Sequence, residues 1–591
     1  MAYSTLCSAA AAQTGGTSSG VGRAATTDTT RYAQTGGTSS GVGRVLGRQN
    51  TVDPRAANEL IAECAARVVS TESLQDGTAL PALASAHCDS FLKLMGSKER
   101  LAPNRRVTIG TACTGSAADV LVFHALEAAY QAYVPSFEVA YEFNCESSAF
   151  KLRWGMTFHG LCSDKDKHCC WFKDIGCLHK GVATCAQHSK ECPVPRVDIF
   201  VCATSCKDFS RANPNKRKRG AALAPPSGES ARTLHGMNQF LSSHRPPLFL
   251  FENVDTIDSS HNSPASGPTD LPLASDMDIM LAHWAALGYE CQRVVVNSRE
   301  FGIPASRSRL LVIGVQTMAN GAFDFSRRSL SCVFNTMRSL IQVCHRTHSC
   351  ASGVLLPSTH PAVQAELARR QQFPTASGQR VSMGYNVGKA MEIAQARGVQ
   401  WGSFSPSPIM RSDAWFQTLT KQQQDAACFS LKSRPDPVLF RDVSQSLGQT
   451  RLSSTRFAEG REEPTHCAAT VLPAQSLMVF APGQPFRLLL GREALVLQGF
   501  PSQDATLSKL IGSFSEVQMA DLAGNMVSTP VMLAIAMAAI SAASWKDVSM
   551  SALPRTTAED CSSAVSLLRS LMPQVRPLGP DSHPEPKRQR Q

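Results

Sequence analysis

The sequence predicts an α/β fold built on a doubly wound sheet, and three observations support this. Short apolar stretches alternate with longer helix-like segments from residue 106 to residue 315. Two stretches, residues 199–203 and 248–251, are continuously apolar, as in strands buried on both faces. A reactive side chain follows each, Cys206 in a polar loop and Glu252 at the strand end. Because open α/β sheets bind ligands at the carboxyl ends of their strands, we expect an active site there.

The chain begins with a low-complexity stretch, residues 1–50, rich in Gly, Ser and Thr. The segment QTGGTSSGVGR occurs twice, from Gln13 and from Gln34. Such a stretch cannot bury enough apolar surface to order itself, so we predict a disordered tail. Residues 51–104 hold two runs with helical periodicity, and we expect a small helical extension packed on the sheet domain.

Residues 105–315 contain the predicted sheet strands in sequence order. VTIGTACTGS, from Val107, predicts a strand and a tight turn. FEVAYEFNCE then predicts a second strand that ends at Glu146, and LLVIGV, from Leu310, predicts the last strand of this part.

The C-terminal half changes character. Residues 316–485 are long and rich in Ser, Arg and Gln, and they break the strand and helix rhythm. Residues 486–545 resume it, with an apolar helix after Pro530 that returns the chain to the first part of the sheet domain. Residues 546–591 form a tail with a basic end.

Composition sets limits on the class of protein. The 591 residues are 43% apolar, which is enough for a sizeable core and a second, smaller lobe. A net charge of +11 favours a polyanionic partner. No signal segment is visible, and residues 531–545 are too few to span a bilayer, so we expect no membrane role. The 20 cysteines then suit a reduced intracellular setting better than a disulfide scaffold.

Two short motifs resemble those of the DNA cytosine carbon-5 methyltransferase family. SCKDFS, around Cys206, is similar to the family's PCQxFS, and ENV, from Glu252, matches its acidic motif. Further segments follow in the family's order over residues 105–543. They are the turn after Val107, the acid Glu146, Asp174-Ile175, EFGIPASRSR (300–309), RLLLGREALVLQGFP (487–501) and LAGNMVSTP (522–530).

The resemblance implies a Rossmann-like class I methyltransferase with a mixed sheet and a smaller target-recognition domain inserted at residues 316–485. It implies that Cys206 attacks carbon 6 of cytosine as a thiolate, its pKa lowered by a nearby lysine or helix N-terminus. Glu252 would donate a proton or hydrogen bond to ring nitrogen 3. Arg309 would stabilise charge on the base carbonyl, and Arg307 would contact a phosphate. Asn253 would hold backbone geometry.

The resemblance also implies S-adenosylmethionine as the methyl donor. It assigns seven residues to this cofactor: Thr111, Cys113 and Gly115 in the loop after the first strand, Glu146 at the ribose hydroxyls, Asp174 and Ile175 at the adenine, and Asn525 at the cofactor side. The family's loop usually carries an aromatic residue and two glycines, and here only Gly115 is glycine. Ser205, Lys207 and Ala305 are further departures, and none of them replaces a group that performs the chemistry.

The function implied is methylation of cytosine carbon 5 in double-stranded DNA, with the target base flipped out of the stack, in the nucleus or another DNA-containing compartment. Two alternatives stay open. One is a relative that methylates cytosine in transfer RNA. The other is a DNA-binding or regulatory relative with impaired catalysis, which the altered cofactor loop favours.

Several of these residues and motifs also have a simpler, non-functional interpretation. Cys206 taken alone would pack as an inert thiol, and Glu252 as a solvated acid. Nine Cys and His side chains lie between residues 162 and 192, but their irregular spacing leads us to expect no metal. The basic run 216–219 is either a phosphate-binding segment, which we favour, or an import signal reinforced by residues 586–590, or a solvated charge run.

Overall fold

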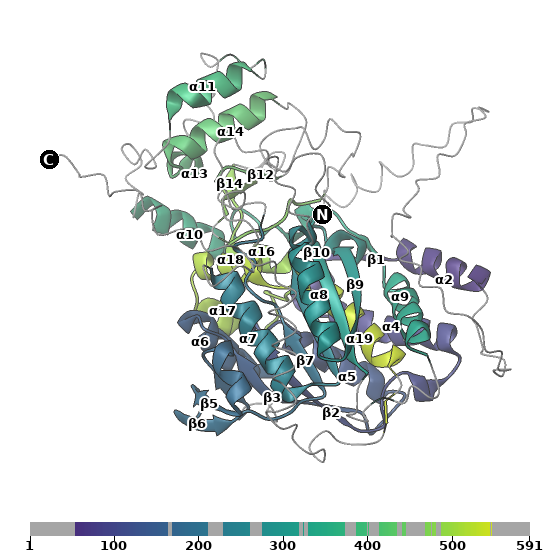
Figure 1. The fold of residues 1–591 in the computed structure, drawn as a ribbon. Coiled ribbons are helices and arrows are strands. Elements are labelled where there is room, and N and C mark those ends of the chain that lie inside the picture. The colour runs from purple at the N-terminus through teal and green to yellow at the C-terminus, as the bar shows by residue number, and fades with distance from the viewer. Residues whose placement is uncertain are drawn as a thin grey trace, which may run out of the picture. The chain divides into compact units, whose positions relative to one another are not determined.

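The computed structural model describes the sheet domain and its helices almost completely (Figure 1). The predicted N-terminal tail, the basic run 216–219 and the tail beyond residue 546 lie outside the described residues. The described residues are 54–162, 168–210, 228–259, 275–317, 323, 329–372, 386–396, 398, 400, 413–433, 440–444, 467–473, 475–479, 486–543, 545 and 546.

The central sheet has nine strands in the order β6-β5-β4-β3-β2-β7-β8-β10-β9 among the described residues. Strands β4, β3, β2, β7 and β8 run parallel, and β10 pairs antiparallel with both β8 and β9. The bounds are β2 (Arg106–Ala112), β3 (Glu138–Cys145), β4 (Cys170–Phe172), β5 (Val182–Cys185), β6 (Lys190–Pro193), β7 (Ile199–Cys202), β8 (Leu248–Asn253), β9 (Tyr289–Asn297) and β10 (Ser308–Gln316).

This order confirms the predicted doubly wound mixed sheet. The chain builds outward from β2 to β3 and β4, then returns to the other side of β2 with β7 and β8. The strand order therefore reverses between β2 and β7, and ligands bind at such a switch point, outside the carboxyl ends of the strands.

Helices cover both faces of the sheet, as Figure 1 shows for α7 and α8 on one side and α5 and α19 on the other. Strand β8 displays the reason. Leu248 and Leu250 belong to one hydrophobic cluster, whereas Phe249 and Phe251 belong to another. Successive strand residues point to opposite faces, so a continuous apolar strand requires cover on both sides. The two layers are α4 (Ala79–Met95), α5 (Asp119–Gln131), α9 (Leu330–Gln342) and α19 (Thr529–Ala542), and α7 (Glu229–His244) and α8 (Asp276–Ala286).

Shorter elements surround these layers. The helices are α2 (Pro54–Ala66), α3 (Thr71–Asp76), α6 (Ala149–Cys162), α10 (Pro361–Gln372), α11 (Val387–Gln395), α13 (Ala414–Gln417), α14 (Lys421–Ser433), α16 (Gly491–Val496), α17 (Ser508–Gly512) and α18 (Glu516–Asn525). Strands β1 (Val68–Val69) and β11 (Thr347–His348) pair with each other, and β12 (Phe440–Asp442), β13 (Leu477–Val479) and β14 (Arg487–Leu488) form a small sheet.

The inserted region has a hydrophobic cluster of its own, and it starts later than predicted. That cluster runs from Leu356 to Leu490 and includes Trp415 and Phe416. Helix α9, placed by the sequence in the inserted region at 316–485, instead packs its apolar side on α19 and belongs to the main core. The predicted boundary at residue 316 is therefore too early. The amphipathic pattern of α9 predicts a helix but does not indicate which lobe the helix covers.

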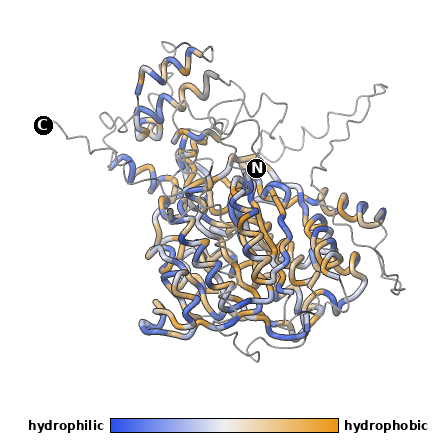
Figure 2. The backbone as a smooth tube through the Cα atoms, in the orientation of Figure 1, coloured by the Kyte–Doolittle hydropathy of each residue, from blue (hydrophilic) through white to orange (hydrophobic). Residues whose placement is uncertain are grey.

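Helix α19 is apolar on all sides because it is a core helix. Residues 516–542 together are long and apolar enough to cross a membrane by composition, but 89% of their most apolar window is buried inside the protein. The segment is also two helices, since α18 ends at Asn525 and α19 begins at Thr529. In Figure 2 the orange, apolar colour is seen along strands and helices at the centre of the sheet domain.

Candidate active site

A cavity of about 1480 Å³ lies at the carboxyl ends of the parallel strands. The loop after each strand contributes to its wall: Gly115 after β2, Glu146 after β3, Asp174 after β4 and Cys206 after β7, with Glu252 near the end of β8. Residues separated by more than a hundred positions thus meet in one cavity, as the switch-point topology requires.

Cys206 lies in a loop that is fixed from two sides. The Asn253 side-chain amide donates to the Thr204 hydroxyl at 3.0 Å and accepts from the Val254 backbone N–H at 2.8 Å. Asn253 is 1% exposed, so these bonds are protected from water. They hold the end of β8 against the Cys206 loop and confirm the expected positional role of Asn253.

Helix α7 holds the other side of this loop. The Ser205 N–H donates to the Thr233 hydroxyl at 3.2 Å. Asp208 and Ser230 exchange two hydrogen bonds, each 3.1 Å long between a backbone N–H and a side-chain oxygen. The first turn of α7 therefore holds the loop by hydrogen bonds between side chains and backbone N–H groups, as is common at helix N-termini.

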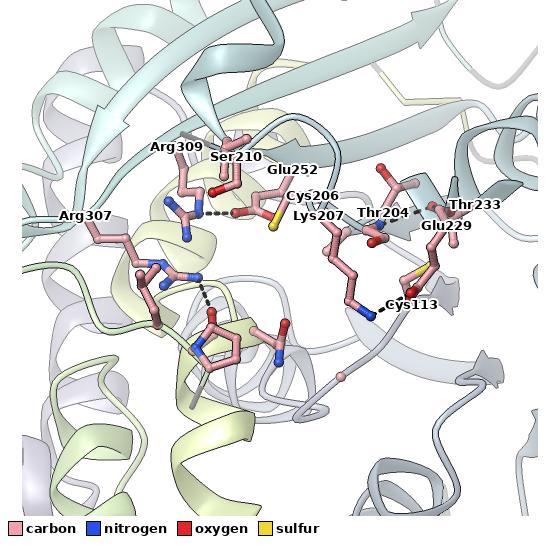
Figure 3. Close-up of a pocket in the computed structure, with 18 of the residues that line it drawn as sticks. Cys113, Thr204, Cys206, Lys207, Ser210, Glu229, Thr233, Glu252, Arg307 and Arg309 are labelled. Carbon is pink, nitrogen blue, oxygen red and sulfur yellow. Dashed lines mark hydrogen bonds and ion pairs between the residues drawn. The ribbon is translucent and has the colours of Figure 1, made fainter. Parts of the chain in front are cut away.

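Glu252 and Arg309 form an ion pair beside the cysteine. The Arg309 Nε lies 2.8 Å from the Glu252 Oε1, and the two side chains are only 10% and 13% exposed. Figure 3 shows the Cys206 sulfur next to the Glu252 carboxylate, with Arg309 on the other side of that carboxylate and joined to it by the ion pair. The strand register explains why Glu252 and Arg309 meet. Strands β8 and β10 are neighbours, and Glu252 in β8 is opposite Leu311, which is two residues after Arg309 in β10. A thiol, a carboxylate and a guanidinium are thus brought together.

The pKa of Cys206 differs from expectation. Burial raises the pKa of this thiol, while the positive charge of Arg309 lowers it in part. Lys207, expected as one source of thiolate stabilisation, instead extends to the surface and pairs with Glu229 at 2.6 Å. The prediction of a lowered pKa is therefore wrong for the protein without ligands, since desolvation disfavours the charged form.

Arg307 also differs from expectation. Its guanidinium donates to the backbone carbonyls of Val471, Gly524 and Met526 at 2.8 to 3.1 Å, and the residue is 3% exposed. Burial lowers its pKa to about 9, so the group stays charged at neutral pH. Donors used in this way do not reach a phosphate. The predicted phosphate contact is wrong, and Arg307 instead fastens two loops to the strand end.

The loop after β2 is strained and points backbone groups at Glu146. Cys113, Gly115 and Ala117 have φ angles of 55°, 60° and 55°, a region that only glycine adopts freely. The Gly115 N–H donates to the Glu146 Oε2 and the Ser148 N–H to the Oε1, both at 2.8 Å. Cys113 thus holds a glycine-like conformation where the family usually has glycine, and such strain gathers at functional sites.

The other residues assigned to the cofactor divide into two groups. Asp174, Ile175 and Asn525 line the cavity. Asp174 accepts a hydrogen bond from the Gly176 N–H at 3.0 Å and begins a short 3₁₀ turn. Thr111 does not line the cavity, because its hydroxyl points into the protein and donates to Asn144 at 2.7 Å. The Thr111 side chain therefore faces away from the cavity, and the assignment of this residue to the cofactor stays a prediction.

A family model described as C-5 cytosine-specific DNA methylase matches residues 183–541. The chain belongs to this family. The match covers β7, β8 and β10, and therefore includes Cys206, Glu252 and Arg309. Methylases of this family use S-adenosylmethionine as methyl donor, and the ordered motifs of the sequence carried the same identification.

Individual relatives are distant. The chain is 24% identical over 473 residues to DNA (cytosine-5-)-methyltransferase DMT5 of Cryptococcus neoformans, which is 75% of this chain and 17% of that protein. It is 28% identical over 139 residues to type II methyltransferase M.NlaX of Neisseria lactamica, 23% of this chain and 38% of that protein. The chain thus spans well under half of either relative's length.

Two solved structures are also similar to this chain. One is methyltransferase EhMeth of Entamoeba histolytica, with 12% identity, a TM-score of 0.36, and coverage of 73% of this chain and 97% of that one. The other is the S. pombe Dnmt2 methyltransferase, with 13% identity, a TM-score of 0.34, and coverage of 74% and 98%.

Several residues that build the methylase site were not identified from the sequence. Thr204, Thr233, Ser230 and Asp208 fix the cysteine loop, yet each is an ordinary small polar residue in its local context. Only the pairing of the loop with α7, which a single sequence does not display, reveals their role. The position of Asp208 within the SCKDFS segment, two residues after Cys206, is the one local indication.

Proposed function

We propose that this chain transfers a methyl group from S-adenosylmethionine to carbon 5 of cytosine in double-stranded DNA. The observation that carries the proposal is the convergence of Cys206, Glu252 and Arg309 on one wall of the cavity that also contains Glu146 and Asp174. A thiol, an acid and a fixed cation are the groups that this reaction requires, and family membership supports the reaction class.

The residues near Glu146 fit the methyl donor. Each carboxylate oxygen of Glu146 accepts one backbone N–H and keeps a free lone pair that can accept from a ribose hydroxyl. Asp174 and Ile175 form the next part of the wall, where the adenine would lie. Bound S-adenosylmethionine would supply an electrophilic methyl group. Glu146, Asp174 and Ile175 would hold it in the cavity that Cys206 also lines.

The residues near Cys206 fit the base. Carbon 5 of cytosine becomes nucleophilic when the Cys206 sulfur bonds to carbon 6, because the ring is no longer aromatic. Glu252 protonates or hydrogen-bonds nitrogen 3, and Arg309 faces the carbonyl oxygen, where charge develops. The sulfonium would supply the methyl group to carbon 5 and leave as a neutral thioether. Loss of the carbon 5 proton to water and cleavage of the bond between the Cys206 sulfur and carbon 6 then release 5-methylcytosine and the thiolate, and the proton at nitrogen 3 returns to Glu252.

Thiolate formation depends on the charges around Cys206. Burial raises the pKa of the thiol, and Arg309 is the largest opposing influence. A positively charged sulfonium in the cavity would act in the same direction as Arg309. We therefore propose that cofactor binding precedes thiol activation, which limits attack by the thiol in the absence of the methyl donor.

DNA is the polymer that we favour. The family model describes DNA methylases, and a net charge of +11 suits a polyanion. The target carbon is inaccessible inside a stacked duplex, so the base would be flipped into the cavity. We propose the nucleus, or another compartment that contains DNA, as the site of action for the same reason.

The test is methyl transfer from labelled S-adenosylmethionine to unmethylated duplex DNA, hemimethylated duplex DNA and transfer RNA. We expect incorporation into DNA, abolished by Cys206→Ala and retained by Cys332→Ser, which alters a half-buried thiol on α9. Incorporation into transfer RNA alone would contradict the proposed polymer. Absence of transfer to any of them, with S-adenosylmethionine still bound in calorimetry, would favour a regulatory relative.

A further inference from the structure

Four side chains at one edge of the sheet converge on a common point away from the proposed active site. They are Cys170 in β4, Cys185 at the end of β5, His188 in the following turn and Cys192 in β6. One possible ligand atom from each lies within 4.8 Å of all the others. None of the four lines the catalytic cavity.

The distances match a tetrahedral metal centre. The His188 Nδ1 lies 3.6 Å from the Cys170 sulfur, 3.4 Å from the Cys185 sulfur and 3.5 Å from the Cys192 sulfur. With Zn–S near 2.3 Å and Zn–N near 2.05 Å, a tetrahedral angle separates sulfur from nitrogen by about 3.6 Å. One imidazole nitrogen equidistant from three thiols is the arrangement that a shared cation requires.

The backbone explains why irregular spacing gives a compact cluster. Strands β5 and β6 form an antiparallel hairpin in which Cys192 pairs with Ala183, and the turn brings His188 back over Cys185. Ser189, in that turn, has a φ of 52°, a conformation that non-glycine residues rarely adopt. Three adjacent strands thus contribute ligands, so the cluster does not need the paired knuckles of a sequence motif.

The ladder between the hairpin and the sheet is short. Strands β4 and β5 share a single residue pair, Phe172 with Cys185, and the Ala186 N–H donates to the Trp171 carbonyl at 2.6 Å. The Trp171 N–H donates to the Cys185 sulfur at 3.4 Å, which is the kind of backbone contact that supports a metal-bound thiolate. An ion held by both β4 and the hairpin would join the two.

We propose that Cys170, Cys185, His188 and Cys192 bind one structural zinc ion. Three thiolates and one imidazole in a tetrahedral arrangement suit Zn²⁺, and four protein ligands leave no open position for catalysis. The sequence alone favours unliganded side chains in this region, because its spacing lacks paired CxxC motifs. The strand geometry supports the opposite conclusion.

The ion would also fix part of the catalytic cavity. Strand β4 ends at Phe172, and Lys173, Asp174 and Ile175, which follow, line that cavity. A metal anchored at Cys170 therefore sets the position of the proposed adenine contact a few residues later. This consequence rests on the proposed function, whereas the presence of zinc does not.

The test is elemental analysis of the full chain, purified under reducing conditions without chelator. We expect about one zinc per chain, as for a closed four-ligand site. Cys192→Ser and His188→Ala lose it, whereas His188→Cys restores a four-ligand set and retains it. The matched control Cys332→Ser keeps the full zinc content. Zinc near zero in the unmodified chain, or full content in Cys192→Ser, would overturn the proposal.

Two further measurements separate a folding defect from loss of the metal. Cobalt added to the metal-free unmodified chain should give the intense visible bands of tetrahedral thiolate coordination, and absence of these bands would overturn the proposal. A count of reactive thiols tests disulfide pairing within the cluster, and such pairing would also overturn it. Both readouts are independent of methyl transfer, so failure of the catalytic proposal would leave them interpretable.

The cofactor consequence has its own measurement. If the ion positions Asp174, removal of zinc should weaken S-adenosylmethionine binding in calorimetry, and readdition should restore it. If the chain contains zinc but binds S-adenosylmethionine equally well after the zinc is removed, only the positional role is contradicted. Zinc present with no cofactor binding at all would contradict the proposed function and leave the metal site standing.

Discussion

Arg307 provides the sharpest test of how the cavity is assembled. Arg307→Met removes a buried guanidinium that donates to three backbone carbonyls. Hydrogen bonds to charged groups contribute about 1.5–3 kcal/mol each, a value that already includes the water lost by both partners. Burial lowers the pKa of Arg307 to about 9, which shows that the site holds the cation against a desolvation cost. We therefore expect a destabilisation at the low end of the range for three such bonds, about 4.5 kcal/mol.

The assay combines thermal unfolding with a salt titration of DNA binding. Arg307→Met should lower the unfolding midpoint, while the matched control Arg299→Met, which alters another arginine of the cavity wall, should change stability by less than about 0.5 kcal/mol. An unchanged midpoint in Arg307→Met, together with a salt slope reduced by about one, would refute this reasoning and restore the phosphate contact.

Two further predictions concern the cysteine. Because burial raises the pKa of Cys206, the rate at which its thiol is alkylated should be low at neutral pH and should rise at alkaline pH. Arg309→Gln should move this pH profile to higher pH, since the charge of Arg309 lowers the pKa of the thiol. Identical profiles for the two proteins would contradict the charge effect assigned to Arg309. Asn253→Ala removes the bonds to Thr204, so kcat should fall about tenfold for a loss of roughly 1.4 kcal/mol while cofactor Kd is unchanged. An unaltered kcat would show that the loop needs no such support.

The sheet can be predicted from the sequence because local runs of apolar residues mark its strands. Residues 199–203 and 248–251 are continuously apolar, and this character predicts a central position with helices on both faces. The polar residue after each strand then identifies the ligand edge. This pattern predicts Cys206 and Glu252, whereas Glu146 is predicted from the family resemblance, and all three line one cavity.

The errors arise where a role depends on partners distant in the chain. Arg307 and Arg309 are two positions apart in one strand, yet Arg309 meets Glu252 whereas Arg307 meets the carbonyls of residues 471, 524 and 526. Only tertiary structure assigns these partners. The raised pKa of Cys206 similarly reflects burial by surrounding residues, which the polar loop sequence does not reveal.

Formation of a covalent bond between Cys206 and the target base tests the central claim most directly. Long duplex DNA containing 5-fluorocytosine in many sequence contexts should trap the protein, because fluorine at carbon 5 leaves no proton to eliminate after methyl transfer. With S-adenosylmethionine present, we expect a denaturant-resistant complex for the unmodified chain and for Cys332→Ser, and none for Cys206→Ala. A complex formed by Cys206→Ala, or none formed by the unmodified chain while it methylates ordinary DNA, would contradict the account.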